Sequence, residues 1–161
     1  MRKYAALIIF ISFAICFPVF ANSDDWTYSP PGSYEQAISI SKETGEIKYH
    51  LYLGKIKFCE VDDEFFCFSS DFLKFSVPKF IKGEEMVWEK GDEKYKLIKM
   101  PVPLRLLGKK IDSYKVTHEK TGMEYFYSKK FGIVMMKMKD IVAPIFILEE
   151  DCGIAASASC K

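Results

Sequence analysis

The chain has 161 residues, with 23 Lys and Arg against 22 Asp and Glu, so its formal charge is close to zero. Only two of the cations, Arg2 and Arg105, are arginines, and the bidentate fork that reads phosphates and bases is therefore nearly absent. This composition argues against a nucleic-acid-binding role, and the lack of Gly/Ser linkers or low-complexity tracts indicates one folded unit.

The first 21 residues have the pattern of a cleavable secretory signal. Two basic residues follow Met1, and residues 4–17 form an uncharged, apolar run. Val19 and Ala21 then place small or β-branched side chains three residues and one residue before Asn22, as signal peptidase requires. An uncleaved membrane anchor is the alternative, but a spanning helix needs about 20 apolar residues and this run is shorter.

Cleavage there leaves residues 22–161 as a single exported domain, long enough to bury a core without help. Loss of the two leader cations gives it 21 Lys and Arg against 22 Asp and Glu. The lysine-rich composition and the lack of an Asn-x-Ser/Thr sequon favour a bacterial protein that is periplasmic or secreted.

Four cysteines follow the leader: Cys59, Cys67, Cys152 and Cys160. An even number in an oxidising compartment predicts two disulfides. Loop closure favours joining neighbours, by roughly 2 kcal/mol over a crossed pairing. A crossed bridge such as Cys59 to Cys160 stays open as an alternative, since long loops stabilise more, by roughly 4 to 5 kcal/mol. A metal or redox site is disfavoured because the Cys-x-x-Cys spacing is absent.

Short runs rich in Ile, Val, Phe and Tyr alternate with turn residues from Ile38 onward, which is the period-two pattern of strands. We expect strands at residues 38–41, 47–53, 56–61, 64–69, 73–77, 86–89, 94–100, 111–118, 123–128, 133–138 and 145–148. Residues 33–41 have a second interpretation, a short helix with Ser33 as its cap and Gln36 completing a capping box.

The spacing of these runs predicts a mostly β fold, a single antiparallel barrel or sandwich built from hairpins, with at most one short N-terminal helix. In the strand expected at 47–53, the apolar residues Ile47, Tyr49, Leu51 and Leu53 share one face. The next tight turn is then expected at Gly54-Lys55.

The hairpin from Phe58 to Phe68 is expected to be closed by a disulfide. Centring its turn on Asp63 sets Cys59 opposite Cys67, at a Cα separation that a disulfide can bridge. One face of the hairpin carries Cys59, Val61, Phe65 and Cys67, and the other carries Phe58, Glu60, Phe66 and Phe68. We expect the first face to turn inward, because it contains no charge.

Nothing in the sequence carries a recognisable catalytic pattern. His50 and His118 are the two histidines, and both are expected on strand surfaces or hairpin mouths. No nucleophile elbow, zinc-binding helix or phosphate loop is present. Four acidic pairs, expected in solvated turns, occur at Asp24-Asp25, Asp62-Asp63, Glu84-Glu85 and Glu149-Glu150. We therefore expect a protein without enzymatic activity, catalytic residues or cofactor.

Met135, Met136 and Met138 form a cluster of thioethers, the type of ligand that holds Cu(I). On a strand, however, Met136 and Met138 share one face while Lys137 and Lys139 share the other. This alternation favours a core face backed by solvated lysines over a metal site.

Adjacent aromatic residues point to opposite faces of a strand, so one member of each pair lies outside a single-layered core. Phe65 with Phe66, and Phe126 between Tyr125 and Tyr127, are the candidates for aromatic surface that binds a partner. A two-layered sandwich that buries both faces is an equally good reading.

These features predict an exported, non-enzymatic binding protein whose partner is another envelope or extracellular protein. An inhibitor, an immunity protein and an envelope accessory factor all fit this description. The first alternative is a carrier with an apolar ligand inside a barrel, which an empty interior would support. The second is an enzyme of unrecognised type, which a histidine beside a carboxylate in a cleft would support.

We predict that the exported product begins at Asn22, because Val19 and Ala21 fit the signal peptidase pocket. Intact-mass measurement of the protein released from the cell envelope checks this, and a mass that includes residues 1–21 would contradict it.

Overall fold

The computed structural model describes residues 25–106, 108–139 and 145–160. The predicted signal, residues 1–21, lies outside the described residues. Antiparallel strands dominate the described part of the chain, which confirms the predicted mostly β class. Among the described residues, no helix is long and apolar enough to cross a membrane.

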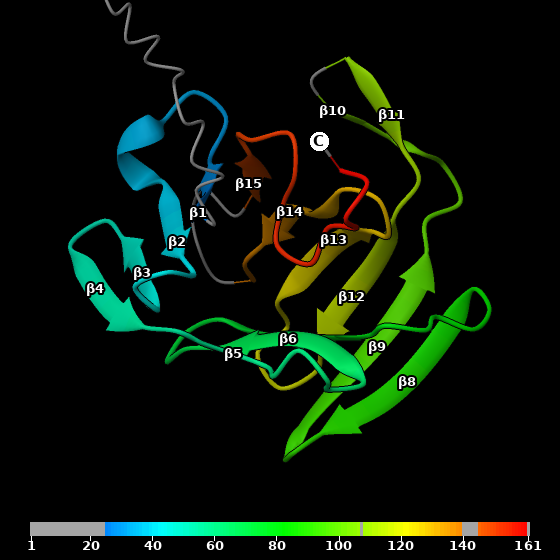
Figure 1. Cartoon of the computed structure of the whole chain (residues 1–161). Coiled ribbons are helices and arrows are strands. Elements are labelled where there is room, and N and C mark those ends of the chain that lie inside the picture. Colours follow the sequence, from blue (N-terminus) through cyan, green and yellow to red (C-terminus); the bar gives the residue numbers. More distant parts are fainter. Residues whose placement is uncertain (1–24, 107, 140–144, 161) are drawn as a thin grey trace, which may run out of the picture.

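Ten strands form one antiparallel sheet in the spatial order β4-β3-β2-β1-β15-β14-β13-β12-β9-β8 (Figure 1). Their bounds are β1 Asp25–Ser29, β2 Ile38–Ser41, β3 Glu46–Tyr49, β4 Tyr52–Lys55, β8 Glu85–Lys90, β9 Glu93–Lys99, β12 Tyr114–His118, β13 Glu124–Ser128, β14 Gly132–Lys137 and β15 Ile145–Leu148. The first strand pairs with the last, with Tyr28 opposite Leu148. The first and last strands of the described chain therefore meet in the middle of the sheet.

Two smaller sheets cover the large one. A three-stranded sheet of β5 (Lys57–Phe58), β6 (Phe65–Ser69) and β7 (Lys74–Pro78) packs across one face (Figure 1). A hairpin of β10 (Leu104–Leu106) and β11 (Lys109–Ile111) packs on the other face. The one helical element, the 3-10 turn η1 (Tyr34–Gln36), lies between β1 and β2 in the described chain.

The main core fills the space between the large sheet and the three-stranded sheet. Phe75 of β7 meets Tyr125 of β13 edge to face, with ring centroids 5.0 Å apart, and stacks on Phe68 of β6 at 5.5 Å. Other side chains buried there are Tyr28, Ile38, Ile40, Ile47, Leu73, Val77, Leu97, Val116, Ile133, Met136, Met138 and Phe146. Aromatic burial on this scale is a large hydrophobic contribution to folding.

The strand predicted over residues 47–53 is wrong, because the chain turns in its middle. His50 has a positive φ of 51°, and Tyr49 pairs with Tyr52 on either side of the turn. Leu51 and Leu53 are therefore 92% and 65% exposed instead of sharing the buried face of Ile47. The predicted turn at Gly54-Lys55 is also wrong, since both residues belong to β4.

Both interpretations of residues 33–41 describe part of what forms. Residues 34–36 make the 3-10 turn, and β2 follows over residues 38–41 with a buried–exposed alternation. The single strand predicted over residues 111–118 is wrong, because Ile111 ends β11 in the small hairpin and Tyr114 begins β12 in the large sheet. Two strands that the sequence pattern did not predict, β1 and β10, are short and carry polar residues. Their positions are set by the neighbours with which they pair.

An ion-paired network joins the three-stranded sheet to the large one. Glu93 of β9 accepts hydrogen bonds from Lys74 of β7 and from His118 of β12, whose Nε2 lies 2.7 Å from Oε2 of Glu93. The other histidine nitrogen lies 2.8 Å from the hydroxyl oxygen of Thr121. The bonds from Lys74 and His118 lower the pKa of Glu93 from its ordinary value to about 2.

We predict that Glu93→Gln destabilises the fold by about 2 kcal/mol near neutral pH, because it removes the charge that Lys74 and His118 face. A carboxyl whose pKa is depressed on folding stabilises fully above its unfolded value and loses that contribution as the pH falls through its folded value. Wild-type stability should thus fall between about pH 4.5 and pH 2.

Urea unfolding at a series of pH values checks this prediction. Glu93→Gln should flatten the acid dependence, whereas Glu89→Gln, at an exposed position on β8, should leave it unchanged. Equal acid slopes for wild type and Glu93→Gln would contradict it.

Candidate functional site

The structure pairs neighbouring cysteines, as loop-closure entropy favoured. Cys59 bonds Cys67 at a Cα separation of 5.2 Å, and Cys152 bonds Cys160 at 5.8 Å. Two disulfides indicate an oxidising environment outside the cytoplasm. Each bond closes a loop, named here the acidic loop (residues 59–67) and the C-terminal loop (residues 152–160).

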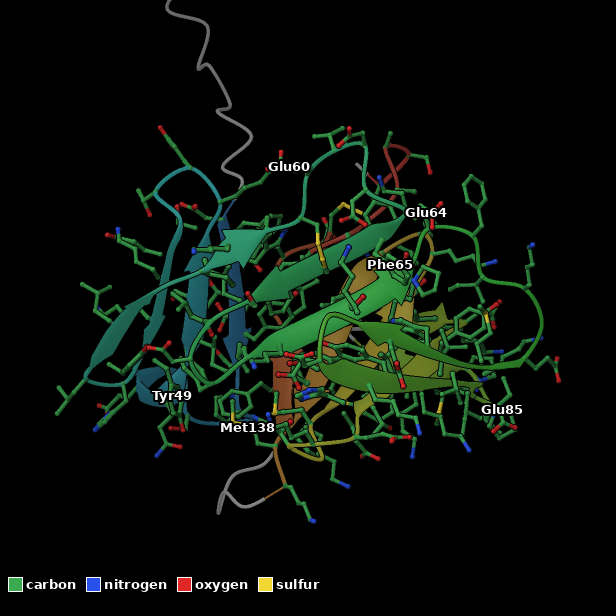
Figure 2. All side chains as sticks on the ribbon, turned by 90° about the horizontal axis from the view of Figure 1, so that it is seen from below. Tyr49, Glu60, Glu64, Phe65, Glu85 and Met138 are labelled. Atoms are coloured by element: carbon green, nitrogen blue, oxygen red, sulfur yellow. A yellow bond between two sulfur atoms is a disulfide. The ribbon has the colours of Figure 1, made fainter. Side chains whose placement is uncertain are left out.

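The two loops face each other across an open cleft of about 950 Å³. Aromatic and aliphatic side chains make up much of its lining: Trp26, Phe58, Val61, Phe65, Phe66, Ile154, Ala155, Ala156 and Ala158. Its charged lining residues are Asp25, Lys42, Glu60, Lys79 and Glu150. In Figure 2, Glu60 and Glu64 lie on the same side of the molecule as the red C-terminal loop. All four bonded cysteines also line the cleft.

Backbone contact at unusually close range holds the C-terminal loop to the start of β14 and to the turn residue before it. The Ile133 N–H donates to the carbonyl of Ile154 at 2.8 Å, and the Gly153 N–H donates to the carbonyl of Phe131 at 2.8 Å. A Cβ atom on Gly153 would lie 2.0 Å from the Ile133 oxygen, and one on Gly132 would lie 2.3 Å from the Ile154 oxygen. Only glycine permits this approach at either position.

Tyr28 of β1 ties the same loop to the core. Its buried hydroxyl donates to the carbonyl of Ile133 at 3.0 Å and accepts from the N–H of Ile154 at 3.3 Å. Burial raises the pKa of the Tyr28 phenol, so the hydroxyl keeps its proton and can donate. One side chain therefore fixes both β14 and the C-terminal wall of the cleft.

Two lysines from outside the acidic loop hold it: Lys79, which lines the cleft, and Lys90, which does not. Lys90 pairs with Asp63 at 2.6 Å and lies 5.0 Å from the ring centroid of Phe65. The hydrogen bond from Lys90 lowers the pKa of Asp63. Lys79 donates to the carbonyl of Val61 at 2.6 Å and lies 5.5 Å from the centroid of Phe66. These cation–π contacts orient both phenylalanines at the mouth of the cleft.

The predicted register of this hairpin is confirmed, but its predicted faces are wrong. Phe58 pairs with Phe68, and the Cys59 N–H donates to the Cys67 carbonyl at 2.9 Å. Phe68 and its neighbours Phe58 and Phe66 pack on the core, whereas Val61 is 95% exposed. Three phenylalanine rings outweigh the one charge on their face, because Glu60 lies in the loop beyond the paired residues.

The five aromatic residues predicted as partner-binding surface fall into two groups. Phe65 and Phe66 are half-buried and line the cleft. Tyr125, Phe126 and Tyr127 are all buried, so the prediction of exposed aromatic surface at β13 is wrong. The reason is a second layer: the β10–β11 hairpin covers the face on which Phe126 lies, with Ile111 and Val134 as its buried neighbours.

The remaining candidates are not gathered at the cleft. His118 is fully buried beside Glu93, so its predicted surface position is wrong, while His50 is exposed in its turn. Met136 and Met138 are buried in the core with exposed lysines between and after them, as the alternation predicted. Met135, half-buried, packs on the opposite side.

One group of donors has the spacing of a metal site. The Asp63 carboxylate and the sulfurs of Cys59 and Cys67 lie within 4.8 Å of one another. The two sulfurs are bonded to each other, so neither is a thiolate, and the carboxylate is paired with Lys90. In this state the group does not offer the ligands that a metal ion needs.

Sequence reasoning missed Trp26, Ile154 and the alanines of the C-terminal loop as cleft residues. Trp26 stands in the unpredicted strand β1, and its ring lies 6.0 Å from that of Phe58. The identical spacing within the two cysteine pairs indicated two loops of the same length. That the two loops lie on either side of one cleft depends on the pairing of β1 with β15. No family model, curated protein or solved structure matches this chain.

We predict that Tyr28→Phe destabilises the protein by about 1 to 2 kcal/mol, because it leaves the buried Ile133 carbonyl and Ile154 N–H without their partner. Amide exchange at Ile154 should accelerate more than global unfolding explains. Tyr52→Phe is the matched control, since it removes a hydroxyl that bonds Asp71 at the surface, where water replaces it.

Urea unfolding and residue-resolved hydrogen exchange measure both effects. Equal stability losses in Tyr28→Phe and Tyr52→Phe, with unchanged exchange at Ile154, would show that this hydroxyl does not hold the loop.

Proposed function

We propose that this protein is a non-enzymatic binding factor outside the cytoplasm, in the periplasm or secreted, that captures another envelope or extracellular protein. The cleft between the acidic loop and the C-terminal loop is its binding site. An inhibitor, an immunity protein or an accessory factor of the cell envelope would each work by such capture. The observation that carries the proposal is that both disulfide-closed loops line one mostly apolar cleft.

Pre-organisation of the walls supports this use. Each loop is closed by a covalent bond and hydrogen-bonded to a core strand or its turn. A partner that enters such a cleft orders little additional chain, which lowers the entropic cost of binding. Val61, almost fully exposed at the rim, supplies apolar area that folding alone does not use.

The packed interior supports a protein binder over a carrier of an apolar ligand. Phe68, Phe75 and Tyr125 fill the space between the sheets in which a carried ligand would have to lie. The histidine that does meet a carboxylate, His118, is fully buried and does not line the cleft. A hydrolytic centre would need such a pair to reach its substrate.

We predict that Val61→Asp lowers the amount of partner retained by the immobilised protein by about tenfold or more, because it places a charge on the apolar rim. Val102→Asp is the control, since Val102 is 69% exposed and stands outside the cleft lining. The measurement is quantitative mass spectrometry of proteins captured from the source cell's envelope fraction.

A protein retained by wild type and Val102→Asp but lost with Val61→Asp is the expected result. Identical capture profiles for the three proteins would overturn the proposed binding site. Wild-type near-UV circular dichroism for both variants excludes misfolding as the cause of a loss.

A further inference from the structure

The two walls of the cleft differ in charge. The acidic loop carries four carboxylates and no cation between its cysteines, whereas residues 152–160 carry no charged side chain. Gly153, Ala155, Ala156 and Ala158 line the second wall. Small side chains on one wall leave room for a large apolar group, and the other wall presents negative charge beside it.

Most of the acidic loop's charge is open to solvent. Glu60, Asp62 and Glu64 are exposed, and Asp25 adds an exposed carboxylate to the cleft lining. Among the loop's carboxylates in the described structure, Asp63 is the one held in an ion pair. Glu60 lines the cleft, and Asp62 and Glu64 stand in the same loop just outside its lining, so the three acids together give this side of the cleft a negative field.

The cleft lining carries two cations, Lys42 and Lys79, against three carboxylates, Asp25, Glu60 and Glu150. The ammonium group of Lys79 is directed toward the protein itself. This group donates to the Val61 carbonyl and lies over the Phe66 ring, so its charge supports the wall of the cleft. An incoming acidic group would have to compete with these contacts and pass Glu60 at the rim. An incoming cation is instead attracted by Glu60 and does not compete for the contacts of Lys79.

The size of the cleft further restricts the occupant. A volume of about 950 Å³ is at the upper end of the range for a site that encloses one small ligand. The cleft can hold a short stretch of chain with one large side chain, whereas a flat protein surface could not enter it.

Resting on the proposed function, we infer that the cleft binds a basic segment of the partner, a loop or terminus in which one large apolar side chain is flanked by lysine or arginine. The apolar side chain lies against the alanine wall and the disulfides. The flanking cations face Glu60, Asp62 and Glu64. Electrostatic attraction raises the rate of encounter, and apolar burial retains the segment.

Fluorescence anisotropy with two labelled synthetic peptides tests the inference. The basic probe is Lys-Lys-Leu-Trp-Lys-Lys, and the acidic probe is Glu-Glu-Leu-Trp-Glu-Glu. The protein is the full chain produced through its own export signal, so that both disulfides form. We expect the basic probe to bind at least about tenfold more tightly than the acidic one, and its affinity to fall as salt is added.

The charge requirement is tested with two matched triple variants. Glu60→Gln, Asp62→Asn and Glu64→Gln together should weaken binding of the basic probe by about tenfold. The control removes three exposed carboxylates outside both the acidic loop and the cleft lining, by Glu89→Gln, Asp92→Asn and Asp112→Asn, and should change affinity less than twofold. Equal losses in the two variants would show attraction by net charge alone and overturn the inference.

The test separates this inference from the proposed function. If the acidic probe binds as well as the basic one, or neither binds, the inference is wrong. The proposed function then still stands wherever Val61→Asp abolishes capture of the partner. If the basic probe binds wild type and Val61→Ser equally, a change that removes the apolar rim side chain without adding charge, the basic segment does not enter the cleft and the inference is again wrong.

Discussion

The pairing of β1 with β15 is the contact on which the rest of the structure depends. It joins residues more than a hundred positions apart, with Tyr28 opposite Leu148, and so makes one continuous sheet from both ends of the chain. The Glu150 carboxylate reinforces the junction by accepting the Thr27 N–H at 2.9 Å and 3.0 Å. Long-range pairing of this kind closes a large loop, and the many contacts of the core offset that entropy.

The cleft is a consequence of this junction. Because β1 lies beside β15, Tyr28 reaches the start of β14, and its hydroxyl fixes the C-terminal loop through Ile133 and Ile154. Trp26, two residues earlier on β1, lies against Phe58 at the start of the acidic loop. One short strand thereby contacts both walls and sets the distance between them.

One disulfide and two lysines hold the acidic loop at different points. The bond from Cys59 to Cys67 limits the unfolded chain and closes the base of the loop. Lys79 and Lys90, from outside the loop, fix its tip by a carbonyl contact and an ion pair with Asp63. A loop held at base and tip keeps its exposed acids in place without burying them, which suits recognition more than stability.

Local patterns in the sequence determined most of the strands, the register of the hairpin from Phe58 to Phe68 and the cysteine pairing. The alternation of buried Ile38 and Ile40 with more exposed residues is a two-residue period, which the sequence shows directly. The short separation of Cys59 and Cys67 likewise favours their pairing, because closing a short loop costs little entropy. The uninterrupted strand predicted over residues 47–53 was wrong because the chain turns at His50 and Leu51 without a glycine or proline, and Tyr49 pairs with Tyr52 across this turn. Turn formation there is decided by pairing partners, which local sequence does not specify.

Only the tertiary structure decided which faces are buried and where the loops meet. Phe126 and Phe65 have the same local pattern, an aromatic beside another aromatic on a strand, yet one is buried under the β10–β11 hairpin and the other lines the cleft. His118 likewise became a core residue because Glu93 and Tyr95 stand beside it on β9. Burial depends on layers contributed by distant segments, and no short-range period records which segment covers which face.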